Sequence, residues 1–558
     1  MERMFWLNSK YMIKNISLET RLRVLIVFVG ILLFLPFNGL VHLFDWDEIN
    51  FAESAREMLV SGNYSTVSIN FIPFWEKPPL FIWMQVLSMK WFGVNEFAAR
   101  FPDAICGVLT LLVLFEIGKR LKNIKFGLLW ALAYGASVLP FLYFKSGIID
   151  PWFNLFIFLS LYFAFRHFSH RAISPKGYRR IILSAAILGL AVLTKGPVAI
   201  LLFGTSLLLY ILIERQLRFL KWADILLFTI VLILSGGAYH IYQILSGNWQ
   251  LVYDFFRYQV RLMKTEDAGH GGSIFYHPLV LFLGVFPSSI LALRAFFKKE
   301  SLNNDFRRLM VILFLVVLII FSLVQTKIVH YSSLCYFPLS YLAALTVYEI
   351  CFNGAKLGKL NKVLLLIIGL VFALIPGALQ LIATTISPEV LHTFIKDDFA
   401  IACIDRSISW GGYEFLVGLF LGISLIVSLF YWSGTKQVVG IFGSTVLFVF
   451  LLMVLVVPKI EKYSQGPAIS YIESFKEKPV WITTIGYYSY APFFYSNKMQ
   501  RACRDSSEEA FFLHGAVDRD VYFVTKVTAL QSIADQNPQL EIVGKKGGFA
   551  LLKRTYKK

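Results

Sequence analysis

Long apolar runs alternate with short polar segments along most of this chain of 558 residues. A transmembrane helix needs about 20 mostly apolar residues, because it must cross the hydrocarbon core of the bilayer. By that criterion the pattern predicts thirteen spans. They lie near residues 23–43, 101–118, 124–144, 151–168, 181–194, 197–213, 223–245, 277–296, 308–325, 331–351, 362–383, 412–432 and 437–457.

The fifth and sixth predicted spans are short, and only the sequence Thr194-Lys195-Gly196-Pro197 separates them. Glycine suits the end of a helix, and proline suits the first turn of the next one. The sequence therefore favours two helices at this point. A single broken helix is the alternative, and it would reverse the orientation of every later span.

The distribution of Lys and Arg decides between these two topologies. With a cytoplasmic N-terminus and thirteen spans, most Lys and Arg residues before residue 459 fall in cytoplasmic segments such as 119–125, 166–180 and 294–308. This bias follows the positive-inside rule, and it holds on both sides of the Lys-Gly-Pro break. The same topology places residues 44–100 and the C-terminus on the exported side.

The exported segment 44–100 carries two short helical patterns. Over residues 51–59 the apolar side chains share one face, and Glu53, Arg56 and Glu57 share the other, a pattern typical of a helix that lies on a membrane. Residues 80–92 are apolar but too few to span the bilayer. The sequence therefore predicts two interfacial helices.

The chain changes character after residue 457. Apolar stretches at 480–485, 521–524 and 549–552 predict strands, and residues 528–536 predict a helix. About a hundred residues are enough to bury a core of their own. We therefore expect an all-α polytopic membrane domain over residues 1–457 and a small α/β domain over residues 458–558 on the exported side.

Composition narrows the functional class. Hydrophobic residues make up 57% of the chain and charged residues only 16%, against about 25% charged in soluble domains. The net charge of +18 belongs to the cytoplasmic ends of the spans, so we expect membrane lipids and no nucleic acid as partners. The span centres hold almost no Asp, Glu, Lys or Arg, which argues against a proton-coupled transporter or a pump.

Charged residues gather instead at the exported ends of the spans. They are Asp45, Asp47, Glu48, Glu76, Lys77, Asp150, Lys195, Arg257, Arg261, Lys264, Glu266, Asp267, His270, Lys327 and His330. Asp47 and Asp150 each stand where a helix begins, so each suits an N-cap. The alternative is a general base or a carboxylate beside a metal, which the three acids within residues 45–48 favour.

Two further motifs could bind phosphate or metal. Lys195 lies between two apolar spans at the exported face, where it could bind a lipid phosphate as a point charge. Glu76 and Lys77 either form a solvated pair worth about 0–1 kcal/mol or belong to a site. The Gly-rich segment 265–272 holds His270, which together with Glu76 could ligate Zn²⁺ or another divalent ion.

The order and spacing of the motifs together identify a family. The motifs are Asp47-Glu48, Phe51-Ala52-Glu53, Arg56-Glu57-Met58, Glu76-Lys77-Pro78, Asp150-Pro151, Thr194-Lys195-Gly196, Glu266-Asp267-Ala268-Gly269-His270, and Lys327 with Tyr331. They resemble those of the GT-C type membrane glycosyltransferases that use polyprenyl-phosphate-linked sugars. Within that family the chain is most similar to the bacterial aminoarabinose lipid A transferases, which are related to the protein O-mannosyltransferases. The resemblance covers essentially the whole membrane part.

The resemblance implies an exported cavity in which a lipid-phosphate sugar donor meets its acceptor. Asp47 and Asp150 match the cavity carboxylates, and we add Glu48 to this predicted catalytic set. Glu76 and His270 match metal ligands, so a divalent ion is the expected cofactor. The residues that match contacts to the donor phosphate are Lys77, Lys195 and Tyr331.

One position departs from the family pattern. Gly271 follows His270, where the lipid A transferases carry Arg, and Arg257 or Arg261 could supply the missing cation. We include Arg261 in the predicted phosphate site. Breaking a sugar–phosphate bond leaves an anionic polyprenyl phosphate, so cations and a metal ion should face the developing charge.

The sequence therefore predicts an inverting glycosyltransferase of the bacterial inner membrane, with its active site on the periplasmic side. The leading hypothesis is transfer of aminoarabinose from undecaprenyl phosphate to a lipid A phosphate. One alternative is transfer of another sugar to a different glycolipid, glycan or protein. Another is an exporter of lipid or polysaccharide, for which we find neither a continuous polar path nor repeated halves.

Overall fold

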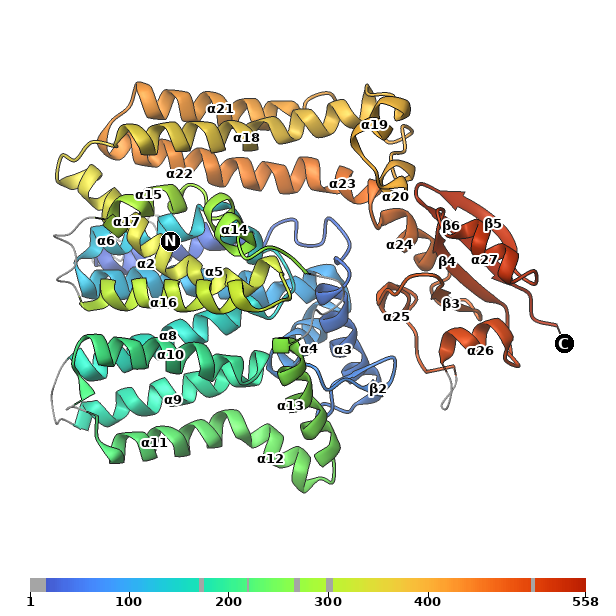
Figure 1. Ribbon diagram of the computed structural model, residues 1–558, viewed down its shortest axis with the longest axis horizontal. Helices are drawn as coiled ribbons and strands as arrows, with labels where there is room; N and C mark the ends of the chain where they lie inside the picture. The colour runs from blue at the N-terminus through green and yellow to red at the C-terminus, as the bar shows by residue number, and fades with distance from the viewer. Residues whose placement is uncertain are drawn as a thin grey trace, which may run out of the picture.

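A computed structural model describes residues 17–169, 175–217, 220–264, 271–297, 305–502 and 507–557. Figure 1 shows layers of long helices that run along the molecule, with a small β-sheet at the end where the chain finishes. The predicted loop residues Glu266, Asp267 and His270 lie outside the described residues.

The helical part begins with α2 and continues to α23. Its α-helices are α2 (Leu18–Phe34), α3 (Asp47–Ser61), α4 (Leu80–Phe92), α5 (Glu96–Leu121), α6 (Ile124–Gly135), α7 (Val138–Tyr143), α8 (Asp150–Ser169), α9 (Pro175–Lys195), α10 (Val198–Ile213), α11 (Trp222–Leu232), α12 (Ala238–Leu245), α13 (Trp249–Lys264), α14 (Tyr276–Gly284), α15 (Ser288–Phe297), α16 (Asp305–Leu323), α17 (Tyr336–Phe352), α18 (Lys359–Thr384), α19 (Pro388–Phe394), α20 (Asp398–Ala402), α21 (Phe415–Phe430), α22 (Gly434–Leu451) and α23 (Val457–Tyr463). The π-helical turns η2 (Ile233–Gly237) and η5 (Leu452–Val456) and the 3₁₀ helix η4 (Val329–Cys335) connect some of them.

An aromatic core joins α6, α8 and α17. Phe158 stacks on Phe337 with ring centres 4.3 Å apart, and Trp130 packs edge to face against Tyr341 at 5.0 Å. The indole N–H of the buried Trp130 donates a hydrogen bond to Ser340 over 3.1 Å. Such pairs add to the free energy gained by burial, so this core stabilises the packing of the three helices.

Seven helices in the described residues are long and apolar enough to cross a membrane, or up to eight if the bent pair α14 and α15 counts as one span. The chain is therefore a membrane protein. Twelve of the thirteen predicted ranges coincide with one or more helices, so their helical character is confirmed. The predicted span 23–43 is wrong in its second half, because α2 ends at Phe34 and Pro36 cannot donate the hydrogen bond that would continue the helix. Several of these helices are shorter than a span, and the number thirteen stays a prediction.

The predicted break between the fifth and sixth spans is confirmed. Helix α9 ends at Lys195 and α10 begins at Val198, with Gly196 at φ +102°, a value that glycine adopts without a steric penalty. The predicted single span over 277–296 is instead two helices that meet at 109°. Pro287 precedes the second of them, and proline cannot donate the hydrogen bond that would continue the first.

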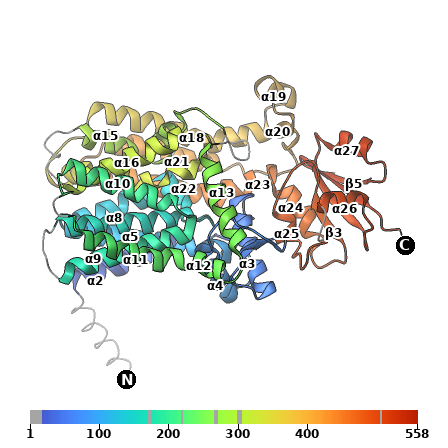
Figure 2. The same cartoon turned by 60° about the horizontal axis from the view of Figure 1, so that its bottom comes forward.

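Helix α3 differs from the predicted interfacial helix in its polar face. Glu53, Arg56 and Glu57 are buried, and Arg56 donates hydrogen bonds to Glu53 and to the backbone oxygen of Lys498 over 2.7 and 2.6 Å. The C-terminal part covers this face, so the polar side chains meet protein and not water. Figures 1 and 2 both show α3 beside α25 (Ala491–Tyr495), between the long helices and the sheet.

The C-terminal part is a four-stranded sheet with short helices. The strands β3 (Trp481–Thr484), β4 (Val521–Lys526), β5 (Glu541–Lys546) and β6 (Phe549–Arg554) lie in the order β3-β4-β6-β5. Its helices are α24 (Gly466–Glu473), α25, α26 (Glu508–His514) and α27 (Leu530–Gln536). Only β3 and β4 pair in parallel. The three predicted strands and the predicted helix are confirmed, and β5 is an element that the sequence analysis missed.

Candidate active site

Four polar side chains from separate elements meet at one end of the helical part. Lys195, the last residue of α9, donates a hydrogen bond to Oδ1 of Asp150 over 2.6 Å. Nε2 of His330, in η4, lies 3.9 Å from Oδ2 of Asp150 and 3.4 Å from Oδ2 of Asp47. The structure thus brings three predicted site residues together and places His330 between the two aspartates.

Burial decreases from one side of this cluster to the other. The side chain of Asp150 is 3% exposed, those of Lys195 and His330 are 14% and 16% exposed, and that of Asp47 is 36% exposed. Among the described residues, Oδ2 of Asp150 has no hydrogen-bond partner. A buried carboxylate oxygen without a donor is costly, so this oxygen is suited to accept a hydrogen bond from a substrate.

Tyr331 lies against the same lysine. The ammonium group of Lys195 is 5.0 Å from the centre of the Tyr331 ring and 5.6 Å from that of Phe153. A cation over aromatic faces and beside a carboxylate is held in one place. Lys195 and Tyr331, both predicted phosphate contacts, are therefore neighbours.

Glu48 is buried in a structural network. Its two carboxylate oxygens accept hydrogen bonds from Nε and Nη2 of Arg100 over 3.0 and 2.7 Å. They also accept backbone N–H groups from Gly147 over 2.6 Å and Phe44 over 2.8 Å. Both carboxylate oxygens of Glu48 already accept hydrogen bonds from the protein. Glu48 is therefore better suited to hold the surrounding backbone in position than to the predicted catalytic role.

The turn that precedes Asp150 is held by side chains from three elements. In this turn, Glu48 accepts a hydrogen bond from the N–H of Gly147. Oδ2 of Asp103, in α5, accepts one from the N–H of Ile148 over 2.9 Å. Lys145 donates to the backbone oxygen of Phe34 and to Asn38 over 3.3 and 3.0 Å. Burial, and secondarily the charge of Arg100, lowers the pKa of Lys145 to about 7. The position of Asp150 therefore depends on this network.

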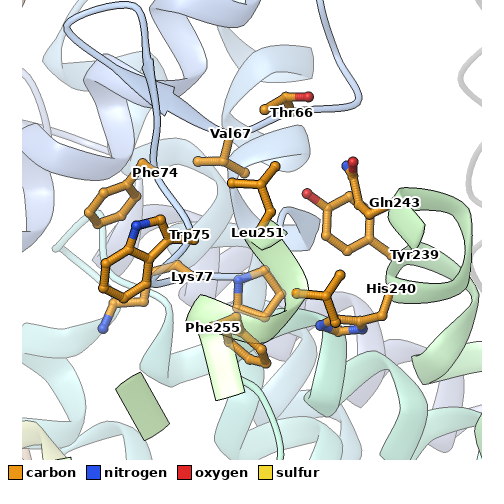
Figure 3. A pocket seen from close by; sticks show the side chains of 12 residues that line it. Thr66, Val67, Phe74, Trp75, Lys77, Tyr239, His240, Gln243, Leu251 and Phe255 are labelled. Atoms are coloured by element: carbon orange, nitrogen blue, oxygen red, sulfur yellow. The ribbon is translucent and has the colours of Figure 1, made fainter. Parts of the chain in front are cut away.

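Lys77 lies on the loop between α3 and α4. Figure 3 shows its side chain alongside the Trp75 ring, with its amino group directed away from Tyr239 and His240 across a pocket between this loop, α12 and α13. The charge of Lys77 acts on His330, as do the charges of Lys195 and both aspartates. Lys77 therefore belongs electrostatically to the cluster.

Arg261 reaches the same region through aromatic contacts. Its guanidinium lies 5.0 Å from the ring centre of Tyr258, one turn earlier on α13. That ring packs edge to face against Trp75 at 5.3 Å. Arg261 is thus connected to the Glu76-Lys77 segment through the rings of Tyr258 and Trp75.

The predicted metal site is only partly described. The charge of Glu76 acts on Tyr488 and Tyr490, which precede α25 in the chain. His270 lies outside the described residues, and the described residues contain no group of three His, Cys, Asp or Glu side chains that could hold a metal ion. Glu76 offers the carboxylate oxygen that such a site needs, and the metal stays a prediction.

Two features of the site had no assigned role in the sequence analysis. His330 was one of many charged residues at the exported ends, and only the tertiary structure places it between Asp47 and Asp150. The rings of Tyr488 and Tyr490 approach Trp46, directly before Asp47, from the C-terminal part. No periodic pattern could have found these contacts, because residues far apart in the sequence make them.

Comparison with known proteins gives similar sequences and a similar fold. Residues 76–239 match the family model described as dolichyl-phosphate-mannose-protein mannosyltransferase. The undecaprenyl phosphate-alpha-4-amino-4-deoxy-L-arabinose arabinosyl transferases of Pectobacterium atrosepticum and Shewanella sediminis are each 28% identical, over 64% and 62% of this chain. The alignments span 65% and 63% of those two relatives.

Two more comparisons extend the coverage. An uncharacterized protein of Aquifex aeolicus is 30% identical over 57% of this chain and 71% of its own length. The crystal structure of ArnT from Cupriavidus metallidurans bound to undecaprenyl phosphate has a TM-score of 0.74 at 18% identity, over 95% of this chain and 98% of that one. The likeness to this structure extends over the helical part and the C-terminal sheet and concerns the fold. The chain belongs to the GT-C family of polyprenyl-phosphate-sugar glycosyltransferases, which includes the bacterial aminoarabinose transferases and the protein mannosyltransferases.

Proposed function

We propose that this protein is an inverting glycosyltransferase that moves a sugar from undecaprenyl phosphate to an acceptor at the exported face of the membrane. The cluster of Lys195, Asp150, His330 and Asp47 carries the proposal. Its buried lysine suits the phosphate of a lipid carrier, and its open carboxylate suits an acceptor. Lys195 ends α9, a helix that is long and apolar enough to cross the membrane, so it lies where such a lipid presents its phosphate.

The reaction breaks the bond between the sugar C1 and the phosphate oxygen, and its electron pair stays on undecaprenyl phosphate. An acceptor oxygen forms the new bond to C1 from the opposite face. Lys77, Lys195 and Arg261 oppose the negative charge that develops on the phosphate, and the Tyr331 hydroxyl donates a hydrogen bond to it. A hydroxyl acceptor gives its proton to Asp47, whereas a phosphate acceptor is already ionised and has no proton to lose.

The leading substrates are aminoarabinose as the sugar and a lipid A phosphate as the acceptor. The names of the Pectobacterium and Shewanella relatives support this choice of sugar and carrier. A second candidate is transfer to a different glycolipid, glycan or protein. Gly271 stands where the lipid A transferases carry Arg and is equally compatible with that alternative.

We place the protein in the bacterial inner membrane, with the cluster and the C-terminal sheet on the periplasmic side. The bias of Lys and Arg toward the opposite ends of the helices supports this orientation. We also propose a membrane domain over residues 1–457 and a periplasmic domain over 458–558. Glu76 and His270 would hold a divalent ion, which would supply positive charge near the donor phosphate.

A reconstituted transfer reaction tests the proposal. Purified protein is mixed with undecaprenyl-phosphate-aminoarabinose and lipid A, and mass spectrometry follows both the released undecaprenyl phosphate and the modified lipid A. Lys77→Ala should lower the rate by roughly 10²- to 10⁴-fold with any acceptor, and Asp47→Ala should do so with a hydroxyl acceptor, whose proton Asp47 takes. Lys90→Ala, on the same exported segment, is the matched control and should keep the wild-type rate. Full activity in both site variants would overturn the assigned residues, and a wild-type protein that transfers no sugar to lipid A or to other envelope acceptors would overturn the function.

A further inference from the structure

Three aromatic rings form a corner where the C-terminal part meets the start of α3. The Tyr490 ring is nearly perpendicular to Trp46 and to Tyr488, at 84° and 89°, with ring centres 5.5 and 5.1 Å away. Trp46 and Tyr488 also contact each other at 5.5 Å. We call Trp46, Tyr488 and Tyr490 the aromatic corner.

The aromatic corner is open to solvent although it lies at a junction of two parts. Tyr490 is only 8% exposed and forms the base, whereas Trp46 and Tyr488 are 45% and 56% exposed. Aromatic rings that served only to join the two parts would bury their faces, because burial of apolar area supplies the free energy of such a contact. The exposed faces are therefore available to a ligand.

The backbone on both sides of the corner is fixed. The Tyr490 N–H donates to Oδ1 of Asp45 over 3.2 Å. Gln465 donates to the backbone oxygen of Leu43 over 2.8 Å and accepts the Asp45 N–H over 3.3 Å. The exposure of Trp46 and Tyr488 is thus a property of an ordered junction, and a rigid aromatic surface loses little conformational entropy when it binds a ligand.

The corner opens beside the proposed reaction site. Trp46 directly precedes Asp47, and the charges of Asp45 and Glu76 act on both Tyr488 and Tyr490. A sugar ring has an apolar C–H face and polar hydroxyl groups, and aromatic rings next to hydroxyl and carboxylate groups can bind both. The C–H face of the sugar packs on an aromatic ring, and its hydroxyls donate hydrogen bonds to the acids.

We propose that the aromatic corner is a saccharide-binding subsite that holds a sugar ring next to Asp47. This inference rests on the proposed glycosyl transfer and adds a role for the C-terminal part, which supplies two of the three rings. The sugar can come from the donor lipid or from the acceptor glycolipid. Both sources present the same ring chemistry, and binding experiments separate them.

Binding of three lipids to wild type and to Trp46→Ala distinguishes these sources. The probes are undecaprenyl-phosphate-aminoarabinose, undecaprenyl phosphate without sugar, and lipid A, each titrated against protein in nanodiscs. In Trp46→Ala we expect the Kd of one sugar-bearing lipid to rise roughly tenfold, because the variant loses an aromatic contact to the sugar. The Kd of undecaprenyl phosphate should not change. A rise for the aminoarabinose lipid assigns the corner to the donor sugar, and a rise for lipid A assigns it to the acceptor.

Further variants test folding and specificity. Trp46→Phe keeps an aromatic face and should recover most of the affinity, whereas Tyr488→Ala should reproduce the loss. Trp91→Ala and Tyr556→Ala replace exposed aromatic residues outside the corner and should bind all three lipids like wild type. Unchanged Kd values in both Trp46→Ala and Tyr488→Ala would overturn the subsite. If binding changes as expected but wild type transfers no sugar, the proposed reaction fails while the subsite stands.

Discussion

The ammonium group of Lys195 and Oδ1 of Asp150 lie 2.6 Å apart, and this hydrogen bond joins the end of α9 to the first turn of α8. Both side chains are largely buried. Removing one partner of a buried ion pair leaves an uncompensated charge and typically costs about 3–5 kcal/mol. The pair therefore affects stability and the proposed chemistry together, and variants have to separate the two effects.

A double replacement separates them. We expect Asp150→Ala to lower the melting temperature and to abolish sugar transfer, because Lys195 is left buried without its partner. Asp150→Asn combined with Lys195→Met removes both charges, so it should recover most of the melting temperature without recovering transfer. Scanning fluorimetry and the transfer assay measure the two properties. Wild-type transfer by the double variant would show that the pair is only structural.

Much of the fold could be predicted from the apolar pattern, and β5 shows where the pattern fails. Ile542 and Val543 of this edge strand are 48% and 51% exposed, and Glu541, Lys545 and Lys546 flank them. An edge strand needs no alternation of buried and exposed residues, so no periodic signal marks it. By contrast, β4 and β6 are mostly buried, and their apolar residues identify them.

The sequence identified several residues of the site, but it could not predict how they lie relative to one another in space. Asp47, Asp150 and Lys195 stand at helix ends in the sequence, and the structure brings them together. The apolar and polar faces of α3 predicted a helix on the membrane, but the cover over Arg56 comes from residues near 498. Contacts between such distant segments leave no local signal in the chain.

Glu48 offers a clear test of positioning against chemistry. Its carboxylate accepts hydrogen bonds from the Arg100 guanidinium and from a backbone N–H in the turn before Asp150. Glu48→Ala should therefore lower the melting temperature strongly, because it leaves Arg100 buried without its anion, at a cost of about 3–5 kcal/mol. Asp47→Asn, at the more exposed neighbouring acid, should keep the wild-type melting temperature and lose transfer to a hydroxyl acceptor.

The opposite pattern would restore the catalytic role that the sequence predicted for Glu48. If Glu48→Ala melts like wild type and transfers no sugar, its carboxylate acts in the reaction. Glu48→Gln serves as the intermediate variant, since its side chain keeps the shape but turns one acceptor into a donor that opposes Arg100.

His42 connects the end of the first helix to the C-terminal part in a pH-dependent way. Helix α2 ends at Phe34, so His42 lies in the connection before α3. Its Nδ1 contacts Glu461, its Nε2 lies 3.5 Å from Glu473, and its backbone N–H donates to Glu461 over 3.2 Å. Burial alone would lower the pKa of His42, but the hydrogen bond with Glu461 and the charges of Glu461, Glu473 and Glu96 together raise the pKa above its usual value of 6.5.

Because the pKa of His42 is raised in the folded protein, the contribution of His42 to stability decreases as the pH rises. A histidine whose pKa is higher in the folded protein binds its proton more tightly there, so its stabilising contribution is complete below about pH 6.5 and is lost as the pH rises through the folded pKa. We expect the melting temperature of wild type, measured relative to His42→Gln, to fall as the pH rises above about 6.5. Glu473→Gln should make this fall smaller, because it removes one of the three carboxylates that favour the charged ring. If the melting temperatures of wild type and His42→Gln changed equally with pH, the charged His42 ring would not stabilise the contact between the connection before α3 and the C-terminal part.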